Sequence, residues 1–397
     1  MNVIVQKYGG SSVADVSGLR RVAERVAQTR RDGHRVVVVI SAMGDTTDEL
    51  LKLAGEVTAN PPRRELDMLL TAGERIAMAL LSMAIQDLGL DSISFTGSQS
   101  GILTNDRHAN ARIIEVRPYR VQDELERDRV VIVAGYQGVS YRREITTLGR
   151  GGSDTTAVAL AAALGAERCE IYSDVDGVYS ADPRTVDGAR PLPEISYEEM
   201  QELSLAGAQV LNAQAVEFAR RAGIVIYARA TVNGKRETRV VVGGPPRSIA
   251  AGVAGAKDLV RLHVGGDGSS TLELAEALQE WDVTPNRISH GSDCAVVLLS
   301  RELCPDLDAL LDRFQGRFGG RLRVERDLCM ASVVGSGIGR NPRNLTRALR
   351  TLEAAGVPVL GVDTSTLRLS VFTRPEALDD GIRALHHEFV ELVPDEG

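Results

Sequence analysis

The chain has 397 residues, more than a single hydrophobic core usually organises, so its length predicts two or three domains. Its formal net charge of −8 argues against a nucleic acid as the main partner, because that binding relies on a concentrated basic surface. The four cysteines are scattered and lack the close spacing of metal and redox sites, which predicts buried, reduced thiols.

Strand-like and helical patterns alternate through the N-terminal part of the chain. The strand-like runs are Val3–Gln6, Val36–Ile40, Val130–Ala134, Cys169–Ser173 and Ile224–Tyr227. The helical patterns are Val16–Arg31, Glu65–Leu88, Thr155–Leu164 and Ala213–Ala222. This alternation predicts a mostly parallel sheet covered by helices on both faces, with ligands bound beyond the carboxyl ends of its strands. Because Lys7, Ser41 and Ser173 end predicted strands, we expect them at one edge.

The pattern changes near Val241–Pro246, where Gly-Pro punctuation indicates a domain boundary. Two shorter α+β units of βαββαβ type follow. The strands predicted for them are Leu259–Val264, Asn286–His290, Ala295–Leu299, Leu322–Glu325, Ala331–Val334, Val357–Val362 and Leu367–Thr373. The helices are Thr271–Trp281, Leu307–Phe314, Asn344–Ala355 and Leu378–Val390. The predicted domains are therefore residues 1–244, 245–328 and 329–397.

The N-terminus runs directly into a strand pattern, without the charged and apolar regions of a signal peptide. By this pattern no apolar run is expected to be long enough to span a bilayer. We therefore predict a cytoplasmic protein with no membrane partner.

The most informative motif is the Gly-rich segment Thr147–Thr156, which precedes the Tyr172–Tyr179 and Ala181–Arg184 segments. Its glycines allow backbone N–H groups to approach an anion, and the helix that begins near Asp154 directs its positive end to the same place. The motif therefore predicts a phosphate cradle beside a nucleotide pocket.

Two further motifs supply the charges that phosphoryl transfer needs around the moving group. Lys7 can neutralise phosphate oxygens, and Gly9 and Gly10 let the turn pass close by; the alternative is an exposed lysine before a flexible turn. Arg150 has the planar fork that grips a carboxylate, and Glu74 could hold an ammonium group. On the residues alone, a surface carboxylate paired with a neighbouring arginine is favoured for Glu74.

Asp154 is also an ordinary helix N-cap, and both roles can coexist. No histidine is needed as a base if the attacking group is a carboxylate, since its pKa of about 3.9 leaves it ionised at neutral pH. His108, the histidine closest to the motifs, is interpreted as a loop residue. In the nucleotide motif, Asp174 and Asp182 are candidates for sugar or amine contacts, although either could simply serve its turn.

These motifs, together with Ser41–Thr47, Met68–Arg75 and Ser94–Gly97, resemble those of the aspartate kinases from residue 1 to about residue 202. The resemblance implies the three-layer α/β/α sandwich of the amino-acid kinases, followed by two ACT-like units. It implies Lys7 and Asp154 as catalytic residues. It implies aspartate contacts from Ser41, Thr47, Glu74, Arg150 and Ser153. The implied ATP contacts are Lys7, Gly9, Gly10, Ser173, Asp174, Tyr179, Arg184, Gln209 and Val210.

Two departures from the aspartate kinases affect the expected activity. The family usually has Gly-x-Lys-Val-Leu where this chain reads Gly207–Leu211, with Gln209 in place of the lysine. A neutral amide makes weaker bonds to phosphate than an ammonium group, so we predict reduced rather than absent kinase activity. The first ACT-like unit has Gly266–Ser269 and Val283–Asn286 where the family has an Asp-x-Pro-Gly turn and an Asn-Ile-Asp segment. We therefore expect weakened feedback by lysine or threonine.

The leading hypothesis is an ATP-dependent kinase, assisted by Mg²⁺, that phosphorylates the side-chain carboxylate of L-aspartate in lysine, threonine and methionine synthesis. A second hypothesis is a kinase of another acidic or modified amino acid. A third is a noncatalytic regulatory subunit that binds amino acids and modulates a partner kinase. The resemblance also implies a homo-oligomer formed through the ACT-like units.

Overall fold

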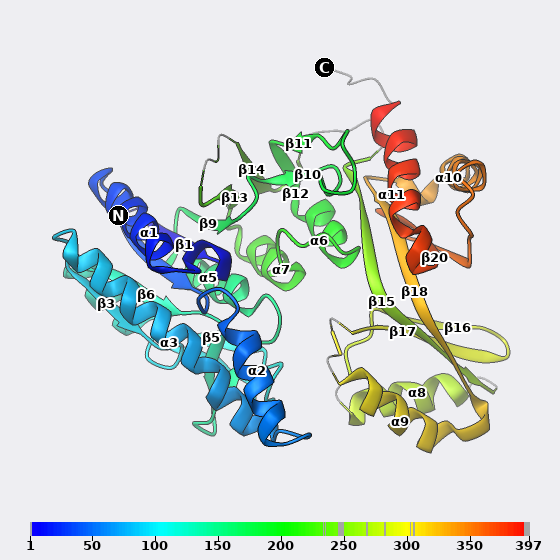
Figure 1. Cartoon of the computed structure of the whole chain (residues 1–397), viewed down its shortest axis with the longest axis horizontal. Helices are drawn as coiled ribbons and strands as arrows, with labels where there is room; N and C mark the ends of the chain where they lie inside the picture. Colours follow the sequence, from blue (N-terminus) through cyan, green and yellow to red (C-terminus); the bar gives the residue numbers. More distant parts are fainter. Residues whose placement is uncertain are drawn as a thin grey trace. The chain divides into compact units, whose positions relative to one another are not determined.

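The structure, a computed structural model, describes residues 2–392 apart from 233, 235, 245–249, 267, 268, 282, 302 and 305. The chain divides into two compact units (Figure 1). The first contains Met1–Val178, Pro191–Gln201 and Gln209–Pro245; the second contains Tyr179–Arg190, Glu202–Ala208 and Pro246–Gly397. The boundary predicted after residue 244 falls at residues 245–249, outside the described part of the chain.

An eight-stranded sheet forms the centre of the first unit, in the order β12-β14-β13-β9-β1-β2-β6-β3. Its strands are β1 (Val3–Tyr8), β2 (Arg35–Ile40), β3 (Ser92–Phe95), β6 (Val130–Ala134), β9 (Arg168–Ser173), β12 (Glu194–Ser196), β13 (Ile226–Ala230) and β14 (Glu237–Val241). Each neighbouring pair is parallel except β13 with β14. The predicted mostly parallel sheet is thus confirmed.

Smaller elements accompany this sheet. A four-stranded sheet, in the order β5-β4-β7-β8, consists of β4 (Ile102–Thr104), β5 (Ile113–Val116), β7 (Gln137–Ser140) and β8 (Ile145–Thr147). Strands β10 (Val178–Tyr179) and β11 (Pro191–Leu192) form a two-stranded pair. The helices that precede residue 245 are η1 (Gly10–Val13), α1 (Val16–Arg31), α2 (Thr46–Val57), α3 (Arg63–Asp87), α4 (Tyr119–Glu126), α5 (Gly152–Leu164), α6 (Tyr197–Leu205) and α7 (Ala213–Ala222).

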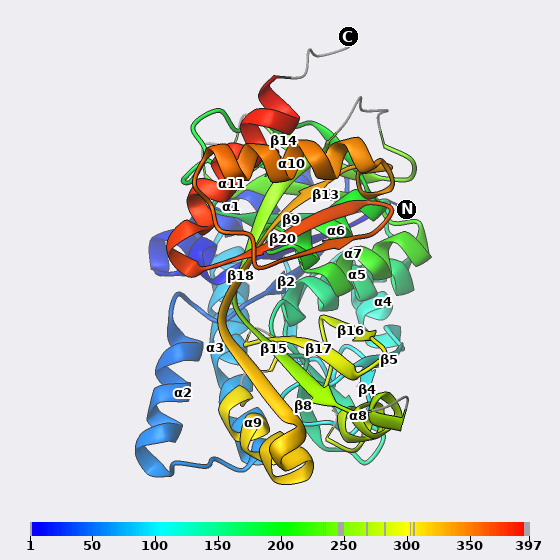
Figure 2. The same ribbon diagram turned by 90° about the vertical axis from the view of Figure 1, so that its right-hand side faces the viewer.

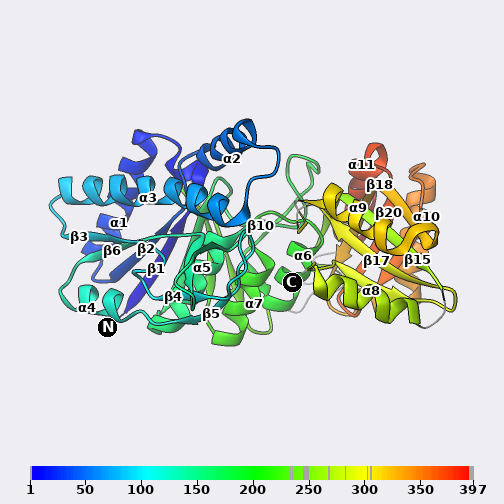
Figure 3. The same ribbon diagram turned by 90° about the horizontal axis from the view of Figure 1, so that it is seen from below.

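Helices cover both faces of the eight-stranded sheet, with α1 and α3 on one face and α5 on the other (Figure 3). Alternation along β1 sends Tyr8 into the apolar core formed with α1 and α3, whereas Lys7 faces α5. Local signals fix the start of α1, because the Asp15 side chain accepts a hydrogen bond from the Gly18 N–H at 2.7 Å. Lys7 therefore lies at the carboxyl end of β1 on the side of the sheet that α5 covers.

Helix α3 has 25 residues and, by length and composition alone, is apolar enough to cross a membrane. This differs from the expectation that no apolar run reaches that length. A core helix passes the same test, and α3 packs against α1, β3 and β6. It also buries the carboxylates of Asp67 and Glu74, so we interpret α3 as a core helix of the first unit.

The second unit contains a six-stranded sheet in the order β16-β17-β15-β18-β20-β19 (Figure 2). Its strands are β15 (Gly252–Gly265), β16 (Arg287–His290), β17 (Cys294–Ser300), β18 (Leu322–Val334), β19 (Gly361–Thr364) and β20 (Arg368–Thr373). Its helices are α8 (Ser269–Glu280), α9 (Leu307–Phe318), η2 (Gly319–Arg321), η3 (Ile338–Arg340), α10 (Pro342–Ala354), η4 (Pro375–Ala377), α11 (Leu378–His386) and η5 (His387–Glu391).

The two predicted βαββαβ repeats share the long strands β15 and β18. We predicted separate strands at Leu322–Glu325 and Ala331–Val334, and this was wrong, because β18 runs through both without a break. The polar residues between the two predicted strands lie where the pairing of β15 with β18 is irregular. At this point Asp258 and Asp327 have φ values of 54° and 56°. Residues 252–256 of β15 pair with residues 330–334 of β18, so the second repeat takes one strand from before the first repeat. The boundary predicted between residues 328 and 329 falls within β18.

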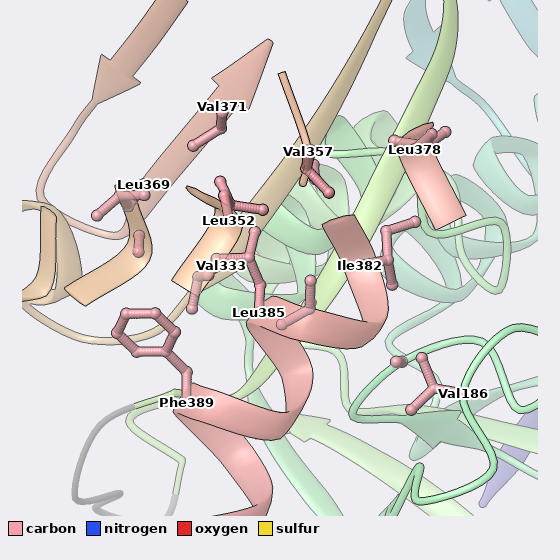
Figure 4. Packing of buried hydrophobic residues seen from close by; sticks show 14 of the residues in the cluster. Val186, Val333, Leu352, Val357, Leu369, Val371, Leu378, Ile382, Leu385 and Phe389 are labelled. Atoms are coloured by element: carbon pink, nitrogen blue, oxygen red, sulfur yellow. The ribbon is translucent and has the colours of Figure 1, made fainter. Parts of the chain in front are cut away.

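Apolar clusters hold the second unit together, among them one under α8 and α9 and one under α10 and α11. In the latter, Val333 of β18 and Leu369 and Val371 of β20 meet Leu352 of α10 and Leu385 of α11 (Figure 4). All four cysteines are free; Cys169, Cys304 and Cys329 are buried and Cys294 is partly exposed.

Candidate active site

Four parallel strands bring their carboxyl ends to one edge of the large sheet, in the order β9-β1-β2-β6. Backbone hydrogen bonds fix the turns that leave this edge. Gly9 N–H donates to the Tyr172 carbonyl at 3.2 Å, Ser41 N–H to the Tyr8 carbonyl at 3.1 Å, and Gly135 N–H to the Ile40 carbonyl at 2.9 Å. The structure therefore gathers the segments after Lys7, Ile40 and Tyr172 as the sequence predicted.

Lys7 and Asp154 form an ion pair at this edge. The Lys7 Nζ lies 2.7 Å from Asp154 Oδ1, and the two side chains are 13% and 11% exposed. Lys7 is thus not the exposed lysine of the alternative interpretation. Asp154 lies in the first turn of α5, whose N-cap is Gly151, so the suggested N-cap role of Asp154 was wrong. An ammonium group, a carboxylate and the positive end of a helix therefore meet in one partly enclosed place.

The loop before α5 has the backbone of an anion cradle. Gly149 and Gly151 have φ values of 74° and 71°, a region that favours glycine. A Cβ atom at Gly151 would also collide with the side chain of Asn212. Asn212 Nδ2 donates to the Arg150 carbonyl at 3.2 Å, and the Asn212 side chain caps α7. This contact ties the loop to the start of α7.

Glu74 lies on α3 and is 3% exposed, so the surface interpretation favoured by its residues alone was wrong. Its Oε1 accepts a hydrogen bond from the Ala42 N–H at 3.3 Å, while its Oε2 is buried without a hydrogen-bond partner. Burial raises the pKa of Glu74 from 4.5 to about 7, against a smaller opposing effect of the Ala42 N–H. A buried carboxylate with a free oxygen is suited to receive a ligand cation such as an ammonium group.

The remaining residues predicted to bind the amino acid lie on the turns of the same unit. Ser41 follows β2 directly, and Thr47 lies in the first turn of α2. Ser153 packs against Gly135 so closely that a Cβ atom on the glycine would lie 2.6 Å from Ser153 Oγ. Arg150 is exposed on the Gly-rich loop. The structure shows where these side chains start, and their contacts with a substrate stay a prediction.

The residues predicted to bind the nucleotide divide between the two units. In the first unit, the Ser173 hydroxyl accepts from the Val175 N–H at 3.3 Å, Asp174 and Gln209 are exposed, and Val210 is partly buried. Gly9 and Gly10 begin the turn into η1. Tyr179 and Arg184 belong to the second unit, where Arg184 forms an exposed ion pair with Asp182 at 2.7 Å.

Two residues beside the predicted site, Asp67 and Tyr136, were not predicted from the sequence. Asp67 is fully buried on α3 and accepts hydrogen bonds from Thr147 Oγ1 at 2.6 Å and the Ala109 N–H at 2.9 Å. Tyr136 has a φ of 66°, which is unusual for a tyrosine, and lies on the turn after β6. The spacing of Asp67 and Glu74, two turns apart on one helix, is the signal that could have revealed Asp67.

Among the residues that the structure describes, no group of three or more His, Cys, Asp or Glu side chains could hold a metal ion. Magnesium bound with a nucleotide takes many of its ligands from phosphates and water, so a single nearby carboxylate is compatible with it.

Comparison with known proteins identifies relatives along the whole chain. The model of the amino acid kinase family matches residues 2–228. The aspartokinase of Mycobacterium tuberculosis (strain ATCC 25618 / H37Rv) is 45% identical over 406 residues, which cover 98% of this chain and 96% of the relative. The aspartokinase of Corynebacterium glutamicum is 43% identical with the same coverage. Among solved structures, E. coli aspartokinase III in complex with aspartate and ADP superposes with a TM-score of 0.85 at 22% identity, covering 98% of this chain and 99% of that one.

Proposed function

The chain belongs to the amino acid kinase family and, within it, to the aspartokinases, and on that premise we propose that it transfers the γ-phosphoryl group of ATP to the side-chain carboxylate of L-aspartate. The products are ADP and 4-phospho-L-aspartate. The observation that carries this proposal is the partly enclosed Lys7–Asp154 pair at the edge where the strand ends and the start of α5 meet.

The chemistry matches what these residues offer. A carboxylate oxygen of aspartate attacks the γ-phosphorus, the bond to the bridging oxygen breaks, and ADP leaves with that electron pair. The attacking carboxylate is already ionised at neutral pH, so the site needs no base. It needs positive charge and N–H donors around the phosphoryl group, which Lys7, the Gly9–Gly10 turn and the start of α5 supply. Asp154 holds the Lys7 ammonium in place.

The acceptor amino acid is held at both of its charged ends. Glu74 receives the ammonium group, because its buried Oε2 lacks a hydrogen-bond partner. Arg150 binds the α-carboxylate with its guanidinium, and Ser41, Thr47 and Ser153 contribute hydroxyl groups. A longer or shorter acidic amino acid would shift its reactive carboxylate relative to Lys7, which makes the choice of acceptor a question of distance.

The residues proposed to contact ATP are Ser173, Asp174, Tyr179, Arg184, Gln209 and Val210. Magnesium, when bound with the nucleotide, neutralises phosphate charge and so reduces repulsion toward the incoming carboxylate. Gln209 supplies a neutral amide where its family has an ammonium group, so phosphate binding is weaker and the rate at low ATP is reduced.

The second unit carries the two ACT-like repeats. Its sequence departs from the family pattern at residues 283–286, which supports weak feedback by lysine or threonine. The sequence also departs at residues 266–269, of which 267 and 268 lie outside the described part of the chain. A second copy of the chain pairs through the ACT-like repeats. The protein acts in the cytoplasm.

Trapping the product with hydroxylamine tests the proposed reaction. The protein is supplied with ATP, magnesium and each of L-aspartate, L-glutamate and modified acidic amino acids, and the hydroxamate is measured. Formation with L-aspartate supports the proposal. Formation only with another acid identifies a different acceptor, and no hydroxamate with any acid favours a noncatalytic regulatory subunit.

A further inference from the structure

Asp67 is the centre of a buried hydrogen-bond network beside the candidate acceptor site. Its carboxylate is fully buried on α3. The Thr147 hydroxyl donates to Oδ1 at 2.6 Å, the Ala109 N–H donates to Oδ1 at 2.9 Å, and His108 Nδ1 lies 2.7 Å from Oδ2.

These bonds join two loops that are far apart in the sequence. Ala111 N–H donates to the Thr147 carbonyl at 2.8 Å, and Leu148 N–H donates to the Tyr136 carbonyl at 2.9 Å. Asn110 Oδ1 lies so close to Gly149 that a Cβ there would be 2.8 Å away. The segment that leads into Arg150 is therefore held on both sides.

Two of the residues held in this way have backbone conformations that are costly without glycine. Ala109 and Tyr136 have φ values of 67° and 66°. Neither has the short polar side chain that makes this region easier to occupy. Such conformations persist only where the surroundings enforce them, and they gather at functional sites. Asp67 bonds the Ala109 N–H and the Thr147 hydroxyl directly, and Leu148, the residue after Thr147, donates its N–H to the Tyr136 carbonyl.

Helix α3 connects this network rigidly to Glu74. Asp67 and Glu74 are two helical turns apart and so lie on nearly the same face, about 10 Å apart along the axis. Asp67 thus sets the position of the Arg150 loop relative to the Glu74 carboxylate. That separation decides whether one small amino acid can bridge the two charges.

We propose that Asp67 is a positioning residue of the acceptor site, holding the Thr147–Arg150 segment and Tyr136 at the distance from Glu74 that fits a small acidic amino acid. This inference rests on the proposed function, because it takes Glu74 and Arg150 as the two groups that bind the acceptor. Asp67 does not contact ATP in this scheme, so its loss weakens acceptor binding selectively.

The test compares Asp67→Asn and Thr147→Val with the control Ser82→Ala. Ser82 lies on the same helix, and its buried hydroxyl is 2.9 Å from that of Ser92, outside the network. We expect Asp67→Asn and Thr147→Val to raise the KM for aspartate about tenfold or more, with the KM for ATP nearly unchanged. Thr147→Ser, which keeps the hydroxyl, should restore most of the loss. Ser82→Ala should lower the thermal midpoint without changing the ratio of the two KM values.

The inference would be overturned if the KM for aspartate and the KM for ATP changed equally in Asp67→Asn and Thr147→Val. It would also be overturned if these variants folded and neither KM changed. If Asp67→Asn does not fold, the Thr147→Val and Thr147→Ser pair decides. If the wild type forms no hydroxamate, the proposed function fails, and calorimetric titration of L-aspartate without ATP decides the inference by itself. Weaker binding to Asp67→Asn than to wild type supports it; equal binding, or none to either protein, overturns it.

Discussion

At the scale of single residues, the buried Glu74 carboxylate gives the site a dependence on pH. Its pKa in the folded chain is raised from 4.5 to about 7, so folding disfavours the ionised form. The contribution of a protonated Glu74 is fully present below about pH 4.5 and is lost as the pH rises toward 7. At pH 8 we expect Glu74→Gln to be more stable than wild type by about 3 kcal/mol at most.

Urea denaturation at pH 8 and at pH 4.5 measures this difference. Glutamine keeps the acceptor for the Ala42 N–H, so the comparison isolates the charge. The difference should shrink to a few tenths of a kcal/mol at pH 4.5, where the folded-state carboxyl is protonated and the unfolded-state carboxyl is about half protonated. If Glu74→Gln were less stable than wild type at pH 8, burial of the ionised Glu74 carboxylate would not be destabilising the fold.

Gln209 is the residue at which the chain departs from its family's phosphate-binding charge. Gln209→Lys should raise kcat/KM for ATP about fivefold, because bonds from charged donors are stronger by about 1 kcal/mol. The control is Gln122→Lys on α4, another exposed glutamine in the first unit, which should leave the rate unchanged. An unchanged or lower rate for Gln209→Lys at limiting ATP would refute the explanation.

The residues that could be predicted from sequence are those whose role follows from local spacing. Lys7 at a strand end and Asp154 beside a Gly-rich turn are visible in this way. Asp67 is not, because its partners Thr147 and Ala109 are 80 and 42 residues away. The burial of Glu74 was likewise hidden, since helix α3 carries exposed Ile76 and Leu80 beside buried charges. Apolar periodicity could not show which face was covered.

At the scale of elements, the contact between the β6 turn and α5 limits what can occupy Gly135. A Cβ there would lie 2.8 Å from Ser153 Cβ and 3.1 Å from the Ile40 carbonyl. We expect Gly135→Ala to destabilise the fold by about 1–3 kcal/mol and to raise the KM for aspartate, because Ser153 must shift.

Gly55→Ala is the matched control for that substitution. Gly55 lies within α2, and a Cβ there meets no atom within 4 Å. Alanine should therefore stabilise this helix by about 0.5–1 kcal/mol. Chemical denaturation and aspartate kinetics measure both variants. If Gly135→Ala were as stable and active as wild type, the close packing of this turn would not constrain the site.

Strand and helix positions followed from apolar patterns where each element has its own core face, as in α1 and α7. The pattern failed at β18, where a polar pair inside a strand looked like a break. An irregularity in the pairing with β15 accommodates that pair, so the strand continues. Such pairing depends on a distant partner, as where Leu259 pairs with Leu328, which no local window contains.

At the scale of the whole molecule, the second unit includes a segment from the middle of the kinase-like sequence. Ala181 and Val186 pack into the same core as Leu385 of α11. The Ser180 hydroxyl also lies 2.8 Å from the buried His386 Nε2. The predicted domain order along the chain could not show this, because the segment joins the second unit through contacts that are about 200 residues apart.

Feedback regulation is a property of the whole chain. Allosteric control requires that an effector bind and that its binding change substrate affinity, typically by about 5- to 150-fold. Because the 283–286 segment departs from the family pattern, we expect millimolar lysine or threonine to leave the rate at low aspartate nearly unchanged. Rates with each amino acid alone and with both together test this, and calorimetry measures binding directly. Leucine serves as the control for nonspecific effects. Tight binding of lysine or threonine together with inhibition would show that the ACT-like repeats still regulate the kinase.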